Sequence, residues 1–116
     1  MWVRACAADD LAPGGVEYVR LGETEVLVCN VDGIFHAVGR RCGHVNAPLE
    51  HGSLDGPYLT CPVHYAQFDV RTGEALSTAV RHSRERRPGD DDVQDLPTYP
   101  VREREGAVEV EVPGAR

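Results

Sequence analysis

The chain contains 116 residues, among them 12 arginines, no lysine and 19 acidic residues, which gives a formal net charge of −7 at pH 7. This length corresponds to one domain that can bury a modest core. The acidic balance argues against nucleic acid and anionic membranes as partners, and it suits a partner protein with a basic docking face.

Four cysteines in a short chain are compatible with two disulfides or with a metal site. The N-terminal residues lack the basic start and apolar run of a signal peptide. No apolar stretch approaches the roughly 18 residues that would span a bilayer. We therefore expect a cytoplasmic protein whose thiols stay reduced and available to a metal.

The first part of the chain predicts short antiparallel strands. Runs rich in β-branched residues are typical of strands, and they occur at residues 2–7, 16–21, 25–31 and 34–38. A turn is expected at residues 22–24, and Asp32-Gly33 is a two-residue hairpin signal. Cys6 and Cys29 lie within these strands, where we expect them to be small buried residues.

Two loops interrupt the strands in the middle of the chain. The first spans residues 39–49, and the second spans residues 61–66 between strands expected at 58–60 and 67–70. Glycine-containing turns are expected at residues 55–57 and 71–73.

The last third contains a charged segment and one clear hairpin. Residues 77–96 hold four arginines and then a run of three consecutive aspartates, so we expect a long solvated loop there. Valine and glutamate alternate around a turn at Gly106, which predicts a half-buried hairpin over residues 101–112. No segment has a sustained helical period, and we therefore expect an all-β chain of antiparallel strands.

Two pairs of metal-ligating residues stand out, Cys42-Gly43-His44 and Cys61-Pro62-Val63-His64, with sixteen residues between His44 and Cys61. Each pair supplies one thiolate and one imidazole. Two cysteines and two histidines are the ligands of a 2Fe-2S centre in which histidine replaces cysteine on one iron. Structural zinc sites usually group like ligands in Cys-x2–4-Cys and His-x3–5-His pairs. The spacing therefore favours iron–sulfur and leaves zinc as an alternative.

Several neighbouring residues have simpler interpretations. His36 is expected at a strand surface or edge, and His82 in the charged loop. His51 competes as a ligand, but it has no thiol at a matching spacing and is expected on the surface. Arg40 and Arg41 directly precede Cys42 and are expected to form a solvated pair.

The residues around the two pairs closely resemble the Rieske ferredoxin family. The resemblance runs through CGHVNAPLEHGSLDGPYLTCPVHYAQFDVRTGEAL and LPTYPV, and it extends more weakly over the whole chain. It implies one domain over residues 1–116, an antiparallel β-sandwich with a two-loop cluster-binding subdomain at about 40–70 and a charged loop at about 80–95.

The resemblance also assigns the ligands of a single 2Fe-2S cluster. Cys42 and Cys61 would bind one iron, and His44 and His64 would bind the other, near the surface. The chain departs from the family pattern at Tyr65, where glycine is usual, and at Val80–Asp95, which has the length of an insertion.

Four residues that bind no metal indicate which kind of centre this is. High-potential members have an extra cysteine in each ligand loop and two hydroxyl groups that hydrogen-bond to the cluster sulfurs. The matching positions here are Ala47, Val63, Ala66 and Phe68. Hydrogen bonds to sulfur stabilise the reduced cluster. We therefore predict a potential near the low end of the Rieske span of roughly −150 to +300 mV.

The resemblance implies a monomeric one-electron carrier rather than an enzyme. A flavin-dependent reductase would supply the electron, and a terminal oxygenase, often an aromatic-ring-hydroxylating dioxygenase, would receive it. The alternatives are a small accessory subunit of an NAD(P)H-dependent nitrite reductase and a zinc-binding interaction module. A catalytic oxygenase subunit is disfavoured because it would need a second domain for a two-His, one-carboxylate iron site.

Overall fold

The computed structural model describes residues 1–40, 48–62, 66–77 and 95–113. Within these residues the protein consists of antiparallel strands and two short 3-10 helices, η1 (Ala8–Asp10) and η2 (Leu49–His51). This confirms the predicted all-β class. In the same residues, no helix is long and apolar enough to cross a membrane.

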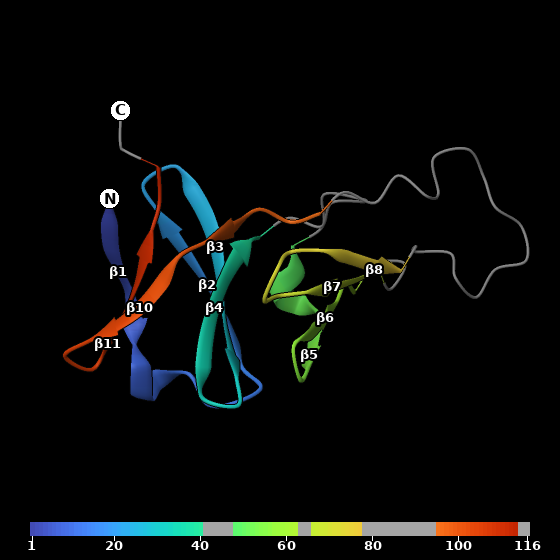
Figure 1. The fold of residues 1–116 in the computed structure, drawn as a ribbon, viewed down its shortest axis with the longest axis horizontal. Coiled ribbons are helices and arrows are strands. Elements are labelled where there is room, and N and C mark those ends of the chain that lie inside the picture. The colour runs from blue at the N-terminus through green and yellow to red at the C-terminus, as the bar shows by residue number, and fades with distance from the viewer. Residues whose placement is uncertain (41–47, 63–65, 78–94, 114–116) are drawn as a thin grey trace, which may run out of the picture.

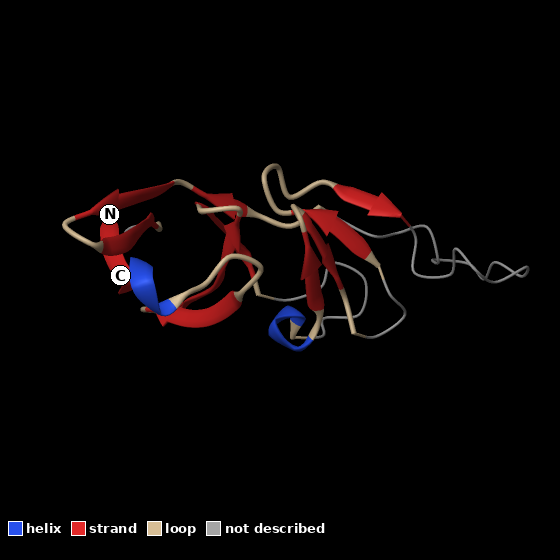
Figure 2. Ribbon diagram, turned by 90° about the horizontal axis from the view of Figure 1, so that it is seen from below, coloured by secondary structure: helices blue, strands red, loops and turns tan. Residues whose placement is uncertain are grey.

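Two sheets form one half of the molecule, which we call the basal half (Figure 1). One sheet has the strand order β1-β11-β10 and the other has the order β2-β3-β4-β9. Figure 2 shows these sheets curving around a common interior. The strands are β1 (Trp2–Ala7), β2 (Val16–Leu21), β3 (Thr24–Val31), β4 (Ile34–Gly39), β9 (Thr98–Tyr99), β10 (Val101–Arg104) and β11 (Ala107–Glu111).

Tight turns set the register of the basal strands. Asp32 and Gly33, between β3 and β4, have φ values of 52° and 93°. Positive φ at both central residues is the type I′ geometry that matches the twist of a hairpin, so the predicted two-residue hairpin is confirmed. The preceding turn is shorter than predicted, because Thr24 already pairs with Leu21.

The third sheet forms the other half, which we call the loop-bearing half. Its order is β5-β6-β7-β8, from β5 (Ser53–Asp55), β6 (Tyr58–Thr60), β7 (Gln67–Asp69) and β8 (Ala75–Ser77). It lies beside the sheet that contains β3 and β4 in both views (Figures 1 and 2). This half holds the described part of the two-loop subdomain predicted from the sequence.

Strand β3 contributes to both hydrophobic cores of the protein. Val26 and Val28 belong to the core between the two basal sheets. Leu27 and Cys29, on the opposite face, belong to the core beneath the loop-bearing sheet. Successive side chains of a strand point to opposite faces, so a continuous apolar run is required where both faces are covered. The sequence VLVC of β3 meets that requirement.

The structure corrects the expected loop at residues 77–96 at both of its ends. Ser77 belongs to β8, and the side chain of Leu96 is only 4% exposed. The Leu96 N–H donates to the carbonyl of Gly73 at 2.7 Å, and Asp95 accepts a hydrogen bond from the Ala75 N–H at 2.9 Å. Both ends are therefore anchored on the loop-bearing half. The rest of the predicted charged loop, including His82, lies outside the described residues.

Candidate metal centre

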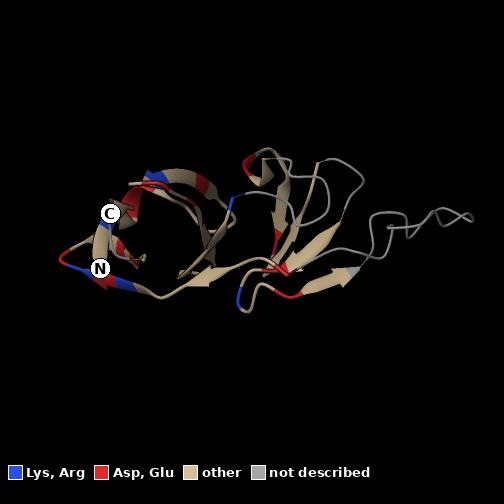
Figure 3. Ribbon diagram, turned by 90° about the horizontal axis from the view of Figure 1, so that it is seen from above, with Lys and Arg blue, Asp and Glu red and all other residues tan. Residues whose placement is uncertain are grey.

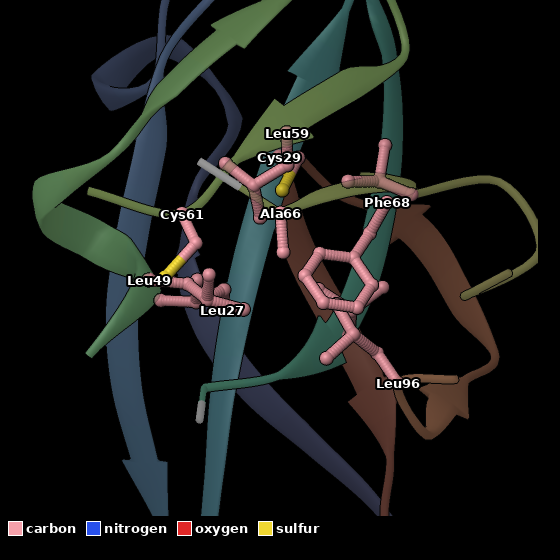
Figure 4. Close-up of a cluster of buried hydrophobic side chains, with 10 residues drawn as sticks. Leu27, Cys29, Leu49, Leu59, Cys61, Ala66, Phe68 and Leu96 are labelled. Atoms are coloured by element: carbon pink, nitrogen blue, oxygen red, sulfur yellow. The ribbon is translucent and has the colours of Figure 1, made fainter. Parts of the chain in front are cut away.

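Cys61 is the one predicted ligand among the described residues, since Cys42, His44 and His64 fall in the undescribed stretches. Its side chain is fully buried and belongs to the core of the loop-bearing half. Figure 4 shows its sulfur beside Leu49, with Ala66 and Phe68 in the same apolar cluster. The first residue of the second ligand loop is thus a predicted ligand that is anchored in the core.

The second ligand loop leaves and re-enters the sheet at adjacent positions. Cys61 follows β6, and its N–H donates to the carbonyl of Ala66 at 2.7 Å. One residue further from the loop on each side, Thr60 pairs with Gln67 across β6 and β7. This pairing closes the base of the loop that contains His64.

The first ligand loop has a similarly closed base. The Leu49 N–H donates to the carbonyl of Arg40 at 2.9 Å, so the residues on either side of segment 41–47 are hydrogen-bonded to each other. Leu49 opens η2, and its side chain is fully buried in the core that contains Cys61. The first ligand loop therefore ends, at Leu49, beside Cys61 in the core.

Gly52 brings the two loop bases into direct contact. A Cβ atom added at Gly52 would lie 2.0 Å from the carbonyl oxygen of Thr60, the residue directly before Cys61. Only glycine permits this approach without displacing backbone. The chain that leaves the first loop is thus packed against the chain that enters the second, as ligands drawn from two loops require.

The donor set fits a 2Fe-2S group. Cys61 differs from the equally buried Cys29 in standing at the base of a ligand loop, where a bound iron would compensate the thiolate charge that an apolar site otherwise penalises. Within the described ranges, no group of three or more His, Cys, Asp or Glu could hold a metal ion. No described carboxylate or histidine cluster therefore competes with the predicted ligands.

The other cysteines have the structural role predicted for them. Cys29 is fully buried and Cys6 is 6% exposed, each in the middle of a strand. Burial raises the pKa of the Cys29 thiol to about 12 and also raises the pKa of Cys6. In the absence of a metal both thiols stay protonated at neutral pH, and both lie in the middle of strands rather than in a ligand loop.

The two described histidines also lie where the sequence predicted. The side chain of His51 is 70% exposed, as expected for a surface residue. His36 is partly exposed on β4, and its pKa is lowered, first by burial and then by the nearby Arg71 guanidinium. The Asp69 carboxylate acts in the opposite direction and raises the pKa of His36.

Arg40 corrects the expectation of a solvated arginine pair. Its side chain is only 17% exposed, and its guanidinium bonds to the carboxylates of Glu50 and Glu25. The Arg40 hydrogen bonds are the main reason that the pKa of Glu50 lies below its usual range. The pattern that could have indicated this contact is an arginine just before and a glutamate shortly after segment 41–47. Arg41 lies outside the described residues.

Comparisons with known proteins show a likeness over almost the whole chain. A family model described as the Rieske 2Fe-2S domain matches residues 1–100. The ferredoxin component of the naphthalene 1,2-dioxygenase/salicylate 5-hydroxylase systems of a Ralstonia species is 33% identical over 101 residues, which cover 87% of this chain and 86% of that protein.

Two solved structures show the same likeness in three dimensions. A chain in a complex of reduced oxygenase and oxidized ferredoxin in carbazole 1,9a-dioxygenase is 33% identical, with a TM-score of 0.79 and coverage of 94% of this chain and 91% of that one. The Sphingomonas yanoikuyae B1 ferredoxin is 28% identical, with a TM-score of 0.80 and coverage of 97% and 100%.

Proposed function

This chain belongs to the Rieske 2Fe-2S domain family, and we propose that it is the one-electron carrier of an aromatic-ring-hydroxylating dioxygenase system. The observation that carries the proposal is the contact between the two loop bases at Gly52 and Thr60, beside the buried thiol of Cys61. This contact brings together the two segments that contain the four ligand residues of the family motif.

The proposed ligands are Cys42 and Cys61 on one iron and His44 and His64 on the other. When bound, such a cluster supplies a one-electron redox couple whose potential depends on its ligands, hydrogen bonds and solvent exposure. The chain itself buries Cys61 in an apolar core, and the two histidines would be presented from loops whose bases are hydrogen-bonded. The imidazoles of His44 and His64 would form the face through which an electron enters and leaves.

The proposed partners follow from the relatives. The similar proteins reported above are a ferredoxin component of dioxygenase systems and a ferredoxin solved together with an oxygenase. We assign to this chain the same position, between a flavin-dependent reductase and a terminal oxygenase. It would be a cytoplasmic, monomeric protein that performs no substrate chemistry of its own, with residues 1–116 acting as one domain.

No specific observation favours either alternative function, the nitrite reductase subunit or the zinc-binding module. The relatives reported above are ferredoxins rather than nitrite reductase subunits. A zinc module remains chemically conceivable with two cysteines and two histidines, and metal content separates it from an iron–sulfur protein.

Electron paramagnetic resonance of the dithionite-reduced protein tests the proposal. We expect two irons and two labile sulfides per chain, and a signal with an average g value below that of the free electron. His44→Ala and His64→Ala should each abolish this signal, whereas His51→Ala should leave it unchanged. Zinc without labile sulfide, or a signal that survives both ligand substitutions, would refute the proposed centre.

A further inference from the structure

Arg40 and Glu50 join the two sides of the first ligand loop through their side chains. Arg40 directly precedes segment 41–47, and Glu50 lies three residues after it. The Arg40 Nε donates to Glu50 Oε1 at 2.9 Å and to Oε2 at 3.0 Å, and Nη2 donates to Oε2 as well. These bonds lie alongside the main-chain bond between Arg40 and Leu49, so the loop base is closed twice.

The same guanidinium is anchored to the basal half. Its Nη1 donates to Glu25 Oε2 on β3 at 3.1 Å, and its plane lies over the ring of Tyr18 on β2 at 4.2 Å from the centroid. The Tyr18 hydroxyl donates to the same Glu25 oxygen at 3.2 Å. Arg40 therefore connects three elements, β2, β3 and η2, and it does so at the start of the first ligand loop.

Position, rather than charge, is what this arginine contributes. Its positive charge already faces two carboxylates of the protein itself, so it has no surplus charge for the cluster or for a docking partner. Both side chains of the Arg40–Glu50 pair are mostly buried, at 17% and 15% exposed. A planar guanidinium can bond two carboxylates and stack on an aromatic ring at once, which an ammonium group cannot do.

We propose that Arg40 is a positioning residue for the metal centre, acting through Glu50, Glu25 and Tyr18. By fixing the two ends of segment 41–47 on both halves of the protein, it holds Cys42 and His44 in register with the second ligand loop. This inference rests on the proposed function, because it requires that those residues ligate the cluster.

The test measures iron retention and the electronic signature of the cluster in Arg40→Gln and Arg40→Lys. We expect iron release to a chelator to be about three- to tenfold faster in both variants, somewhat less than the effect of removing a direct partner of a metal ligand. The g values of the reduced protein should also shift, since the ligand loop is repositioned. Because Lys keeps the charge but not the fork, Arg40→Lys should resemble Arg40→Gln rather than the wild type.

Arg102 offers a matched control on the far side of the basal half. Its guanidinium also lies over an aromatic ring, that of Trp2 at 4.2 Å, and bonds a carboxylate, that of Glu109 at 2.7 Å. Arg102→Gln removes an aromatic contact and an ion pair of the same kinds at a more exposed residue on another sheet, and it should leave iron release and g values at their wild-type values. Should the Arg40 variants fail to accumulate, Glu50→Gln tests the same contact more gently, with the same expected direction.

The outcomes separate this inference from the proposed function. A wild-type protein without a 2Fe-2S signal refutes the function itself. A wild-type signal together with unchanged iron release and g values in Arg40→Gln and Glu50→Gln refutes only the positioning role. An equal acceleration in Arg102→Gln would show a general effect of stability and would also overturn it, as would a wild-type result for Arg40→Lys.

Discussion

Ala66 and Phe68 have no side-chain group that could donate a hydrogen bond to the proposed cluster. Both side chains are fully buried in the core that contains Cys61, and neither has a polar atom. No hydroxyl can therefore be supplied from these two positions, and their complete burial leaves no exposed surface at which water could replace one. The structure thus shows an apolar environment at both positions, as the low-potential prediction assumes. The potential itself stays a prediction.

Ala66→Ser should raise the midpoint potential. A hydroxyl at this position can donate to a cluster sulfur and stabilise the more negative, reduced form. A net hydrogen bond of about 0.5–1.5 kcal/mol corresponds to about 20–60 mV for a one-electron couple. Redox titration monitored by circular dichroism measures the change. A potential that stays the same or falls would contradict the argument.

Ala37→Ser is the control for the buried hydroxyl. Ala37 is 2% exposed on β4, but it belongs to the core between the basal sheets rather than to the core around Cys61. This substitution also places a polar group in an apolar site, so it reproduces any general loss of stability. Its midpoint potential should match that of the wild type.

Single residues were predictable where their role depends on local pattern. Cys6 and Cys29 sit in strands rich in apolar residues, and their burial follows from those strands. Arg40 was predicted wrongly because its partners come from positions 15 residues before and 10 residues after it. Contacts between residues this far apart in the sequence depend on how the sheets pack, which local sequence pattern does not reveal. The ligand motif was recognisable from spacing, whereas the geometry of Cys42, His44 and His64 lies outside the described residues.

At the scale of elements, η2 and β6 are held together by a glycine contact. Gly52 ends η2 and directly precedes β5, which pairs with β6 from Ser53 to Asp55. The pairing sets the Gly52 backbone against the Thr60 carbonyl, so the geometry of the sheet determines the spacing of the two ligand loops. A side chain at position 52 would have to push those loops apart.

Gly52→Ala should therefore reduce both stability and iron retention. The added Cβ would lie 2.0 Å from the Thr60 oxygen, which is backbone and cannot rotate away. Overpacking of this kind costs about 1–3 kcal/mol. Urea unfolding measures the loss of stability, and chelator challenge at low urea measures iron release, which should be faster.

Gly56→Ala provides the comparison for that prediction. Gly56 has φ 57° and no atom within 4 Å of an added Cβ, so its cost is limited to backbone strain of about 1–2 kcal/mol. It lies in the turn between β5 and β6, away from the loop bases. Iron release should be close to wild type in Gly56→Ala; equal release in both glycine variants would contradict a specific role for the Gly52 contact.

The longer strands were predictable from the sequence, and so were the short strands β6 and β7 on either side of the second ligand loop, whereas β5, β8 and β9 were not. Strands β1 to β4 contain six or more residues each, and their apolar pattern and turn residues define them without a partner. Strands β5, β8 and β9 have two or three residues and exist through their pairing with neighbours. Such short runs carry too few side chains for a period to be recognised.

At the scale of the whole molecule, the two halves meet through polar as well as apolar contacts. His36 on β4 belongs to the basal half, and it lies close enough to Arg71 and Asp69 of the loop-bearing half for both to affect its pKa. The Arg71 side chain bonds Asp69 through Nε at 3.0 Å and Nη2 at 2.8 Å. Figure 3 shows acidic residues spread over both halves, and Arg71 pairs with one of them, Asp69, at this junction.

This junction should make stability depend on pH between mildly acidic and neutral conditions. Burial and the Arg71 charge lower the pKa of His36 below its ordinary value of 6.5. The unfolded chain then binds the proton more readily than the folded protein, so stability falls as the pH drops through 6.5 toward the folded-state pKa. Above that window, His36 is neutral in both states and contributes no slope.

Substituting His36 isolates this contribution from that of the other histidines. On going from about pH 7.5 to about pH 5.5, a range that brackets the ordinary histidine pKa, the wild type should lose more stability than His36→Gln, as measured by urea midpoints of the cluster-loaded proteins. Arg71→Met should show a smaller loss than the wild type, because it removes the cation that lowers the His36 pKa and leaves Asp69, which raises it. Identical pH dependence in all three proteins would mean that protonation of His36 does not weaken the contact between the halves.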